Sequence, residues 1–415
     1  MVRHYDIVIV GGGPVGLGFA CLAGGLGLQV AIVDDKAEAL LADPPPDGRD
    51  IALTHRSVQI LEDLGVWRGI DSAEIAPIAR ARVRNAASPY LLRLDHERTG
   101  CGALGCLVSN HILRRRLYHA AKERKDVDFL TGTGANTLDL DDPVARISLS
   151  SGDTLEATLV VAADSRFSSM RRKAGIGAQM RDFGQVAIVC RMKHEKPHDG
   201  TAYEWFGTDR TLAVLPLNNR EVSIVLTLPG NAGPRAMGLS PHDFAADIEQ
   251  RFSSQWGHME PSGERYAYPL VVVYADRFSA HRFALIGDAA VGMHPVTAHG
   301  FNFGLKGMHN LATKVGAAAA AGRDIGSAQV LASYDREHRA ATYPLYVATN
   351  ALVALYTGNG VVTQVTRDAV LRLGNALSPV KSWLLRKLTE TDENALWPEE
   401  PRPLASRSQP QHRNA

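Results

Sequence analysis

The residues with the clearest chemistry form a glycine-rich turn near the N-terminus. Gly11, Gly13 and Gly16 occupy the fixed places of a G-x-G-x-x-G pattern, with Pro14 and Val15 between the second and the third. In such a turn the first glycine permits the tight bend, the second lets a pyrophosphate approach the backbone, and the third lets the following helix pack on the preceding strand. The N-terminus of that helix also attracts anions. The pattern therefore predicts that these residues bind the phosphates of a dinucleotide.

The elements that flank this turn are those that the pattern requires. Residues 6–10 are apolar, as in a buried strand, and residues 17–26 are apolar at helical spacing. Asp34 ends the next apolar run, 18 residues after Gly16, in the place where a carboxylate accepts hydrogen bonds from a ribose hydroxyl. Asp35 is the neighbouring alternative, and Asp34 is preferred because it comes first. We therefore expect a strand, turn, helix and strand with Asp34 at the ribose.

Later segments alternate between two kinds of sheet. Residues 159–163 and 283–286 are continuous apolar runs, which are typical of strands in a parallel sheet. Short alternating segments at 83–99 and 184–228 indicate an antiparallel sheet. We therefore predict an α/β fold: a Rossmann-like parallel sheet with an inserted antiparallel-sheet substrate domain and a helical C-terminal region.

This order of elements divides the chain into segments of three kinds and a tail. The tail carries several prolines and hardly any apolar residue, so it cannot bury a core. The expected division is a dinucleotide-binding domain of residues 1–82, 107–180 and 276–330, an antiparallel-sheet domain of residues 83–106 and 181–275, C-terminal helices at 331–390 and a disordered tail at 391–415.

The composition excludes several classes of protein. Lys+Arg 45 against Asp+Glu 44 leaves a net charge of +1, so we expect no nucleic-acid partner. The four cysteines are scattered, and Cys101 and Cys106 lack the spacing of a zinc or redox pair, which favours reduced thiols and no metal. We see no signal peptide, and no apolar run reaches the roughly 20 residues that cross a bilayer. We therefore expect a cytoplasmic protein, which leaves room for contact with the inner face of the cytoplasmic membrane.

Three segments together resemble a known family. They are residues 5–34, residues 160–171 with Ala163-Asp164-Ser165-Arg166, and residues 285–305 with Gly287-Asp288 and His294-Pro295. In these segments the chain resembles the aromatic-ring flavoprotein monooxygenases of the para-hydroxybenzoate hydroxylase type, and within them the ring hydroxylases of ubiquinone biosynthesis. The similarity covers roughly residues 3–390.

The resemblance implies that the dinucleotide is FAD. It places Gly287 and Asp288 at the ribityl chain. A carboxylate there can accept hydrogen bonds from the ribityl hydroxyl groups. It places Arg49 and Asn110 beside the flavin or its phosphates, and it links Asp164 to flavin and nicotinamide binding. The alternative is that Arg49 is an ordinary surface arginine, and the motif around it disfavours that alternative.

The resemblance also implies that Gly300, Phe301 and Asn302 lie against the flavin ring, with backbone N–H groups that stabilise negative charge there. His294 and His299 are the candidate catalytic residues, because imidazole titrates near neutral pH. For His294 a role in shaping the turn is favoured over proton transfer. For His299 proton transfer and a neutral hydrogen-bonding role remain equal alternatives.

The chain departs from its relatives at four positions beside the expected flavin. Ser165 stands where a glycine is usual. Where relatives have Ala-Gly-Gln-Gly this chain has Thr297-Ala298-His299-Gly300, so Thr297 replaces the alanine and His299 replaces the amide. Gly307 replaces an acid. A serine at position 165 requires either a negative φ or backbone strain. His299 thus occupies a place that an amide side chain normally fills.

The resemblance implies an FAD-dependent monooxygenase that hydroxylates a prenylated phenol or benzoquinol through a flavin C4a-hydroperoxide, with O₂ as oxidant and NAD(P)H as a transient reductant. Other ubiquinone-biosynthesis proteins and a membrane surface are the expected partners. Residues 361–388 combine apolar and basic side chains and are a candidate for the membrane face, with a core-packing helix pair as the alternative. The alternatives in function are a soluble hydroxylase of free phenols and a non-catalytic scaffold subunit.

Overall fold

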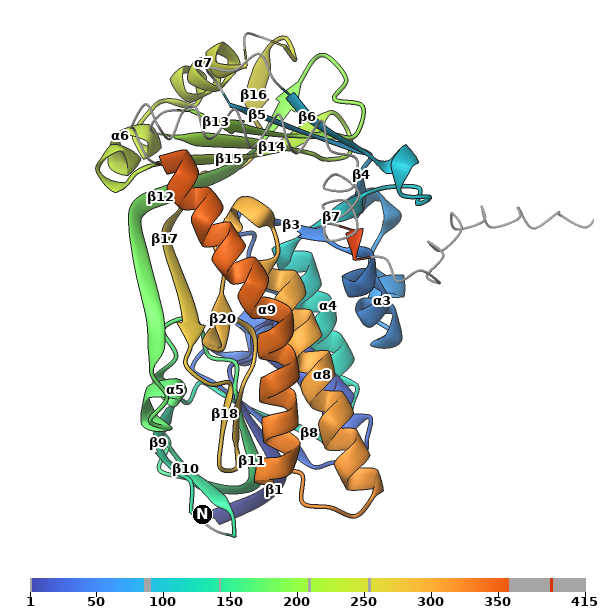
Figure 1. The fold of residues 1–415 in the computed structure, drawn as a ribbon, viewed down its shortest axis with the longest axis vertical. Coiled ribbons are helices and arrows are strands. Elements are labelled where there is room, and N and C mark those ends of the chain that lie inside the picture. The colour runs from blue at the N-terminus through green and yellow to red at the C-terminus, as the bar shows by residue number, and fades with distance from the viewer. Residues whose placement is uncertain are drawn as a thin grey trace, which may run out of the picture.

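A computed structural model describes residues 2–85, 91–141, 143–207, 210–252, 255–357 and 389–390. The segment 361–388, expected to face the membrane, lies outside the described residues, and so does the expected tail at 391–415. The described chain contains two large sheets stacked along the long axis of the molecule, with long helices beside the lower one (Figure 1). This arrangement confirms the expected α/β fold.

The lower sheet is built on the strand-turn-helix-strand unit that the sequence predicts. Strand β1 pairs in parallel with β2 on one side and with β11 on the other, and β8 and β19 extend the parallel order. Its apolar strands are buried on both faces, which explains their continuous hydrophobic runs. The bounds in sheet order are β18 Ser279–Ala280, β19 Phe283–Leu285, β11 Thr154–Ala162, β1 Val2–Val10, β2 Val30–Asp34 and β8 Val127–Thr131, with β10 Ala145–Leu149 and β9 Ala135–Asp139 beside β11.

Helices cover the lower sheet and position the glycine turn. Helix α1 (Pro14–Gly24) follows the turn and packs against α4 (Asn110–Lys122) and α8 (Gly300–Ala320). Helix α9 (Ala328–Thr357) lies along α8 and reaches up to the second sheet (Figure 1). The short helices are α2 Glu38–Ala42, α3 His55–Asp63 and α5 Ser169–Lys173.

The upper sheet holds the strands that the sequence assigns to the inserted domain. All its pairs are antiparallel except one, since β5 and β13 run parallel, which the sequence analysis did not expect. A parallel pair is possible here because β5 and β13 are far apart in the chain and are not joined by a hairpin. The bounds in sheet order are β20 Val291–Gly292, β17 Tyr266–Ala275, β12 Ala178–His194, β15 Glu221–Pro229, β14 Thr211–Pro216, β13 Thr201–Phe206, β5 Arg80–Asn85 and β6 Leu91–Asp95, with β16 Met259–Pro261 beside β12.

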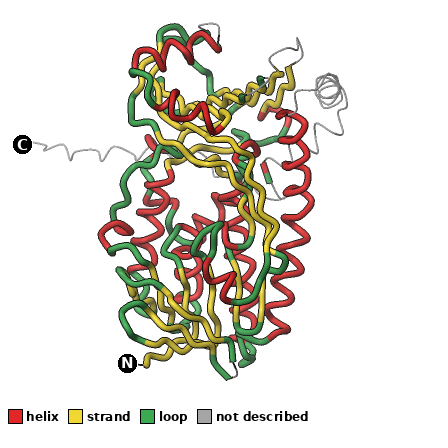
Figure 2. The backbone as a smooth tube through the Cα atoms, turned by 90° about the vertical axis from the view of Figure 1, so that its left-hand side faces the viewer, coloured by secondary structure: helices red, strands yellow, loops and turns green. Residues whose placement is uncertain are grey.

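Two long strands join the two bodies. The strands β12 and β17 pair along most of their length and run from the lower body into the upper sheet (Figures 1 and 2). Helices α6 (Gly233–Met237) and α7 (Pro241–Arg251) cover the outer face of the upper sheet. Its inner face is directed towards the lower body, where a small sheet of β3 (Asp50–Leu53), β7 (Gly105–Ser109) and β4 (Ala76–Ile78) covers part of it. Any site between the bodies therefore draws residues from both.

Candidate functional site

The glycines of the N-terminal turn are required for different reasons. Gly11 has a φ of +114°, which side chains rarely adopt, and a Cβ there would overlap the backbone of Ala163. A Cβ at Gly16 would overlap the carbonyl oxygen of Gly11. The fold itself therefore requires glycine at both positions.

Gly13 is not required by the fold. Its φ of −74° is open to any residue, and a Cβ built on it meets no atom within 4 Å. Helix α1 begins directly after it, with Pro14 in its first turn and no side chain capping its N–H groups. The open space and the uncapped helix end together fit a pyrophosphate that approaches the backbone.

Asp34 lies at the end of β2 with its carboxylate turned towards this loop. Its Oδ2 accepts a hydrogen bond of 2.6 Å from the backbone N–H of Gly12, and its Oδ1 accepts one of 2.9 Å from Lys36. These bonds hold the carboxylate at the carboxyl edge of the parallel sheet, where ligands bind in this class of fold. Binding of the ribose by Asp34 stays a prediction.

Arg49 and Asn110 meet at a carboxylate that the sequence analysis missed. The guanidinium of Arg49 forms an ion pair of 2.5 Å with Asp47, and the Asn110 amide donates a hydrogen bond of 2.7 Å to the same oxygen. Arg49 also lies 5.3 Å from the ring centroid of Tyr268, whose hydroxyl donates to the Asp47 carbonyl. Burial raises the pKa of Asp47, but hydrogen bonding and charge from Arg49 outweigh it and the net pKa is lowered. In the sequence, the position of Asp47 two residues before Arg49 was the only indication that it belongs to this site.

Asp288 is held by a second arginine that the sequence analysis did not single out. Arg166 forms an ion pair of 2.8 Å with Asp288 and donates a 2.8 Å hydrogen bond to the Val271 carbonyl. Gly287, directly before it, has a φ of +60°, so glycine is favoured there. The carboxylate remains 38% exposed, which leaves it free to accept hydrogen bonds from a ribityl chain. That role also stays a prediction.

Asp164 caps a helix in the structure. Its Oδ2 accepts hydrogen bonds from the backbone N–H groups of Ser169 (2.8 Å) and Met170 (3.3 Å) in the first turn of α5. The other oxygen, Oδ1, is buried without a hydrogen-bond partner. Next to it, Ser165 has a φ of +152°, so this departure from glycine is accompanied by backbone strain.

Asn302 uses its whole amide to hold the loop in front of α8. Its Oδ1 accepts from the backbone N–H of Thr54 (3.0 Å), and its Nδ2 donates to the carbonyls of Ala52 (2.8 Å) and Ala298 (2.9 Å). Any contact between this residue and a flavin therefore falls to its backbone. Helix α8 begins at Gly300 without a side-chain cap, so its N-terminal partial charge is available to a ligand.

The two candidate catalytic histidines are both buried. His294 accepts a 3.3 Å hydrogen bond from Val296 through Nδ1, while its Nε2 has no partner, and its ring edge packs 5.1 Å from Phe183. Burial lowers the pKa of His294 to about 4, so the ring is neutral at physiological pH and cannot serve there as the acid. His299 occupies the N-cap position of α8 without a side-chain hydrogen bond to the helix, and its ring lies 5.8 Å from Phe303. The structure favours the turn-shaping interpretation of His294, and a catalytic role of either histidine stays a prediction.

The structure explains one of the other two departures from the family, Gly307, and does not describe the side chain of the second, Thr297. A Cβ at Gly307 would lie 2.6 Å from Nε2 of His338, a ring that is 2% exposed and stacks on Tyr334. The imidazole thus fills the space beside α8, and an acid would not fit at position 307. The side chain of Thr297 lies outside the described part of the structure.

Among the described residues there is no group of His, Cys, Asp and Glu that could hold a metal. In the described ranges, no helix is long and apolar enough to cross a membrane. The open glycine turn at the carboxyl edge of a parallel sheet and the two helix N-termini without a side-chain cap fit a protein that binds a dinucleotide such as FAD.

Comparisons with known proteins agree with this class. Residues 4–345 match the family model described as FAD binding domain. The chain is 40% identical to ubiquinone hydroxylase UbiM of Neisseria meningitidis over 94% of this chain and 85% of that protein. It is 34% identical to ubiquinone hydroxylase UbiL of Rhodospirillum rubrum over 96% of this chain and 92% of that protein. The chain belongs to this family of FAD-dependent hydroxylases, and FAD is its cofactor.

Solved structures confirm the fold. The p-nitrophenol 4-monooxygenase PnpA of Pseudomonas putida aligns with a TM-score of 0.76, covering 94% of this chain and 99% of that chain at 18% identity. The flavin-dependent brominase Bmp2 aligns with a TM-score of 0.74 at 17% identity. Both similarities concern the arrangement of the two sheets alone.

Proposed function

We propose that this enzyme hydroxylates the aromatic ring of a prenylated phenol or quinol in ubiquinone biosynthesis. The observation that carries the proposal is the near full-length similarity to two proteins named ubiquinone hydroxylases, at 40% and 34% identity. NAD(P)H is the reductant and O₂ the oxidant. No feature of the described residues favours a free phenol or a scaffold role over this function.

The chain contributes binding, orientation and the exclusion of water. When bound, FAD supplies the activation of O₂ and the transfer of one oxygen atom. The N–H groups that follow Gly13 would receive the pyrophosphate, and Asp34 and Asp288 would accept hydrogen bonds from sugar hydroxyls. The partial positive charge at the N-terminus of α8 would stabilise negative charge on the bound flavin, and the Asn302 amide holds the loop in front of that helix.

The test is hydroxylation by the purified, FAD-loaded protein. We expect NAD(P)H-driven conversion of a short-chain demethoxyquinol to a product one oxygen atom heavier, measured by mass spectrometry, and restored ubiquinone formation in cells that lack their own hydroxylase. Hydroxylation of simple phenols without turnover of any quinol would contradict the substrate. Purified protein without flavin absorbance or flavin uptake would favour the scaffold role.

We also propose that the enzyme meets its substrate at the inner face of the cytoplasmic membrane, because a prenylated ring partitions into lipid. An apolar surface supports this. A groove of about 610 Å³ between β12 and α9 is lined by Met180, Arg181 and Val347, among others. Met180 and Val347 are 47% and 46% exposed. Exposed apolar side chains next to an arginine suit a membrane with anionic lipids.

Flotation with vesicles of phosphatidylethanolamine and phosphatidylglycerol tests the membrane proposal. We expect the wild-type protein to float with the vesicles and the double variant Met180→Glu/Val347→Glu to remain in solution. Leu40→Glu is the matched control, because Leu40 is 48% exposed on α2, away from this groove. Equal flotation of all three proteins would contradict a membrane contact through this groove.

A further inference from the structure

Glu204, in the middle of β13, points away from the helices that cover the upper sheet. Its sequence neighbours face those helices: Trp205 stacks on Phe252 with ring centroids 4.6 Å apart, and Tyr203 packs edge-on against Trp256 at 5.2 Å. Successive side chains of a strand point to opposite faces. Glu204 therefore belongs to the inner face, which is directed towards the lower body (Figure 1).

The inner face at this level is the one that the Arg49 loop contacts. A Cβ at Gly48 would lie 3.0 Å from the Val189 side chain and even closer to the Tyr266 ring, so this loop packs on both. Val189 is three strands from Glu204 in the same row, about 14 Å at the usual spacing of strands. The row in register across the sheet is Glu204, Ala213, Val225, Val189 and Tyr266. If the aromatic ring of a substrate is bound on this face next to the Arg49 loop, the edge of the ring that is remote from the loop points towards Glu204.

Among the described residues, the apolar cover from the small sheet reaches the position next to Glu204 on this face. Two residues earlier on the same face, Ala202 packs with Ala81 against the small sheet of β4 and β7. Glu204 itself is only partly buried, so its side chain remains accessible to a small molecule. Its direct neighbours on this face, Val83 and Ala213, are apolar.

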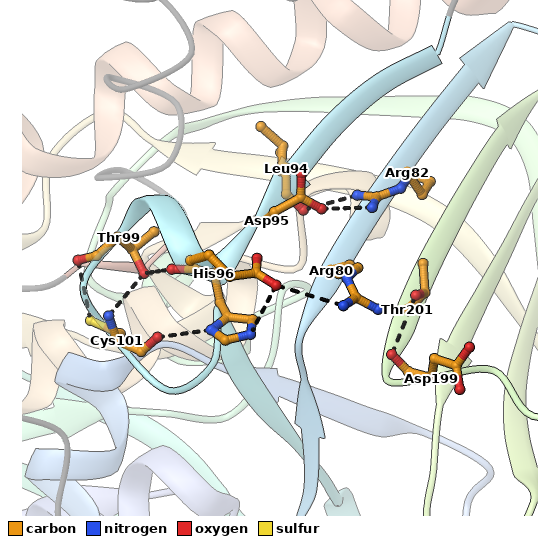
Figure 3. A network of polar contacts seen from close by, with 10 residues as sticks. Arg80, Arg82, Leu94, Asp95, His96, Thr99, Cys101, Asp199 and Thr201 are labelled. Atoms are coloured by element: carbon orange, nitrogen blue, oxygen red, sulfur yellow. Dashed lines mark hydrogen bonds and ion pairs between the residues drawn. The ribbon is translucent and has the colours of Figure 1, made fainter.

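Among the described residues, Glu204 has neither a hydrogen bond nor an ion pair. The three arginines of β5 are in register with Thr201, Tyr203 and Trp205, so they lie on the opposite face. Arg82 pairs there with Asp95 at 2.6 Å (Figure 3), Arg80 lies 3.6 Å from Glu97, and Arg84 lies over the Trp205 ring at 5.5 Å. Its unpartnered carboxyl oxygens keep contact with solvent on the inner face, so they are open to a ligand. A carboxyl group that its surroundings desolvate and that no side chain pairs is a candidate for recognising a ligand.

The protonation state of Glu204 suits a neutral ligand. Burial raises its pKa to about 8, so the group is a carboxylic acid at pH 7, with one donor and acceptor capacity. The other titratable or charged groups of this face lie on β12, β15, β17 and the Arg49 loop. They are Tyr266, Tyr268, Lys193, Arg49 paired with Asp47, Arg191 paired with Asp50 at 2.6 Å, and Glu221 at 3.9 Å from Arg191.

We propose that Glu204 recognises the substrate by a hydrogen bond between its carboxyl group and an oxygen substituent, a hydroxyl, methoxy or carbonyl oxygen, on the substrate's ring. This inference rests on the proposed function and adds to it the residue that orients the ring.

The test compares FAD-loaded wild type, Glu204→Gln and Glu204→Leu. Each is assayed with a short-chain demethoxyquinol and with analogues that each lack one ring oxygen. We expect wild type and Glu204→Gln to lose at least about tenfold in kcat/KM when the contacted oxygen is removed. We expect Glu204→Leu to be weakened by a similar factor on the full substrate, chiefly through KM, and to lose nothing more with that analogue. Glu260→Leu on β16, a side chain 70% exposed, is the control and should behave as wild type.

A pH series provides a second measurement that needs no leucine variant. As pH rises through about 8 the Glu204 carboxyl ionises and loses its O–H donor. For a methoxy or carbonyl oxygen, which can only accept, KM of the wild type should therefore rise while KM of Glu204→Gln does not. Two results would overturn the role of Glu204: the same response of all variants to every oxygen deletion, or the same rise of KM in wild type and Glu204→Gln. If the wild type still turns over the quinol, the proposed function stands in either case. Absence of quinol turnover by the wild type would refute both.

Discussion

At the scale of single residues, a glycine that the fold does not need is informative about a ligand. Gly11 and Gly16 are required by a positive φ and by backbone contact, and both would be glycine without any dinucleotide. Gly13 has an ordinary φ and open space, so the approach of the pyrophosphate is the remaining physical reason for its identity. Glu204 is informative in the same way, because no described contact of the fold explains a carboxyl group there.

Gly13→Val should therefore abolish FAD retention without unfolding the protein. The valine side chain enters space that the pyrophosphate needs, while no protein atom lies within 4 Å of its Cβ. We expect colourless purified protein with an unchanged far-ultraviolet circular dichroism spectrum. Gly263→Val is the matched control, since its Cβ also meets nothing within 4 Å and it lies between β16 and β17 of the upper sheet. A Gly13→Val protein that kept its full flavin colour would contradict the assignment of this turn to pyrophosphate binding.

At the scale of elements, the departures from the family are explained by the elements beside them. Ser165 lies between β11 and α5, in a turn that Asp164 and Ser168 tie to the first turn of α5. Gly307 lies on α8 where His338 of α9 packs against it. One departure is accompanied by strain and the other by a side chain from a neighbouring helix.

Ser165→Gly should stabilise the protein. Glycine adopts a φ of +152° without the strain of a side chain, which costs about 1 to 3 kcal/mol for other residues, although the 3.2 Å hydrogen bond from Phe167 to the serine oxygen is lost. We expect a gain of about 1 kcal/mol in the free energy of unfolding, measured with urea. Ser168→Gly serves as the opposite control, because Ser168 caps α5 through a 2.9 Å bond and its loss destabilises. A Ser165→Gly protein less stable than wild type would show that the turn is unstrained.

Gly307→Ala should destabilise the protein by about 1 to 3 kcal/mol, although alanine favours a helix, because the new methyl group meets the buried His338 ring. The same change combined with His338→Ala should cost nothing further, since the two sites interact directly. Gly316→Ala on the same helix is the control: its neighbour there is the exposed side chain of Leu26, which has space to turn away. Additive effects of the two substitutions in thermal unfolding would contradict the contact.

At the scale of the whole molecule, buried titratable groups in both bodies determine how stability depends on pH. Burial lowers the pKa of His294 and His338 from 6.5 to about 4, so their contribution to stability is lost as pH falls from about 6.5 towards 4. Burial raises the pKa of Glu204 from 4.5 to about 8, so its contribution is lost as pH rises through that window. The two effects have opposite signs, because the native histidines bind fewer protons than the unfolded ones and the native glutamate binds more.

We therefore expect a stability curve that falls on both sides of a maximum near pH 6.5, where the histidine effect ends. Glu204→Gln should flatten the fall between pH 6.5 and 8, and His338→Phe should flatten the fall between pH 6.5 and 4. Thermal unfolding across pH 4 to 9 measures both slopes, independently of any shift in absolute stability. Curves that stay parallel to the wild type would contradict the assigned protonation states.

The sequence by itself determined the parts of this protein that depend on local pattern. The strand, the glycine turn, helix α1 and Asp34 are adjacent in the chain, so spacing and periodicity were sufficient to place them. The return of the chain to the parallel sheet at β11 and β19 was also predictable, because continuous apolar runs indicate buried parallel strands.

Only the tertiary structure decided the contacts between residues that are far apart in the chain. The pairs Asp47–Asn110, Arg166–Asp288 and Gly307–His338 join separate elements, and no local pattern encodes them. Asn302 shows the same limit: its motif indicated a flavin contact, and its amide is occupied by Thr54 and Ala52 from another segment. Glu204 had no signal in the sequence, because the face to which it points depends on the register of β13 with β14 and β5. Strand register is decided by packing across the whole sheet.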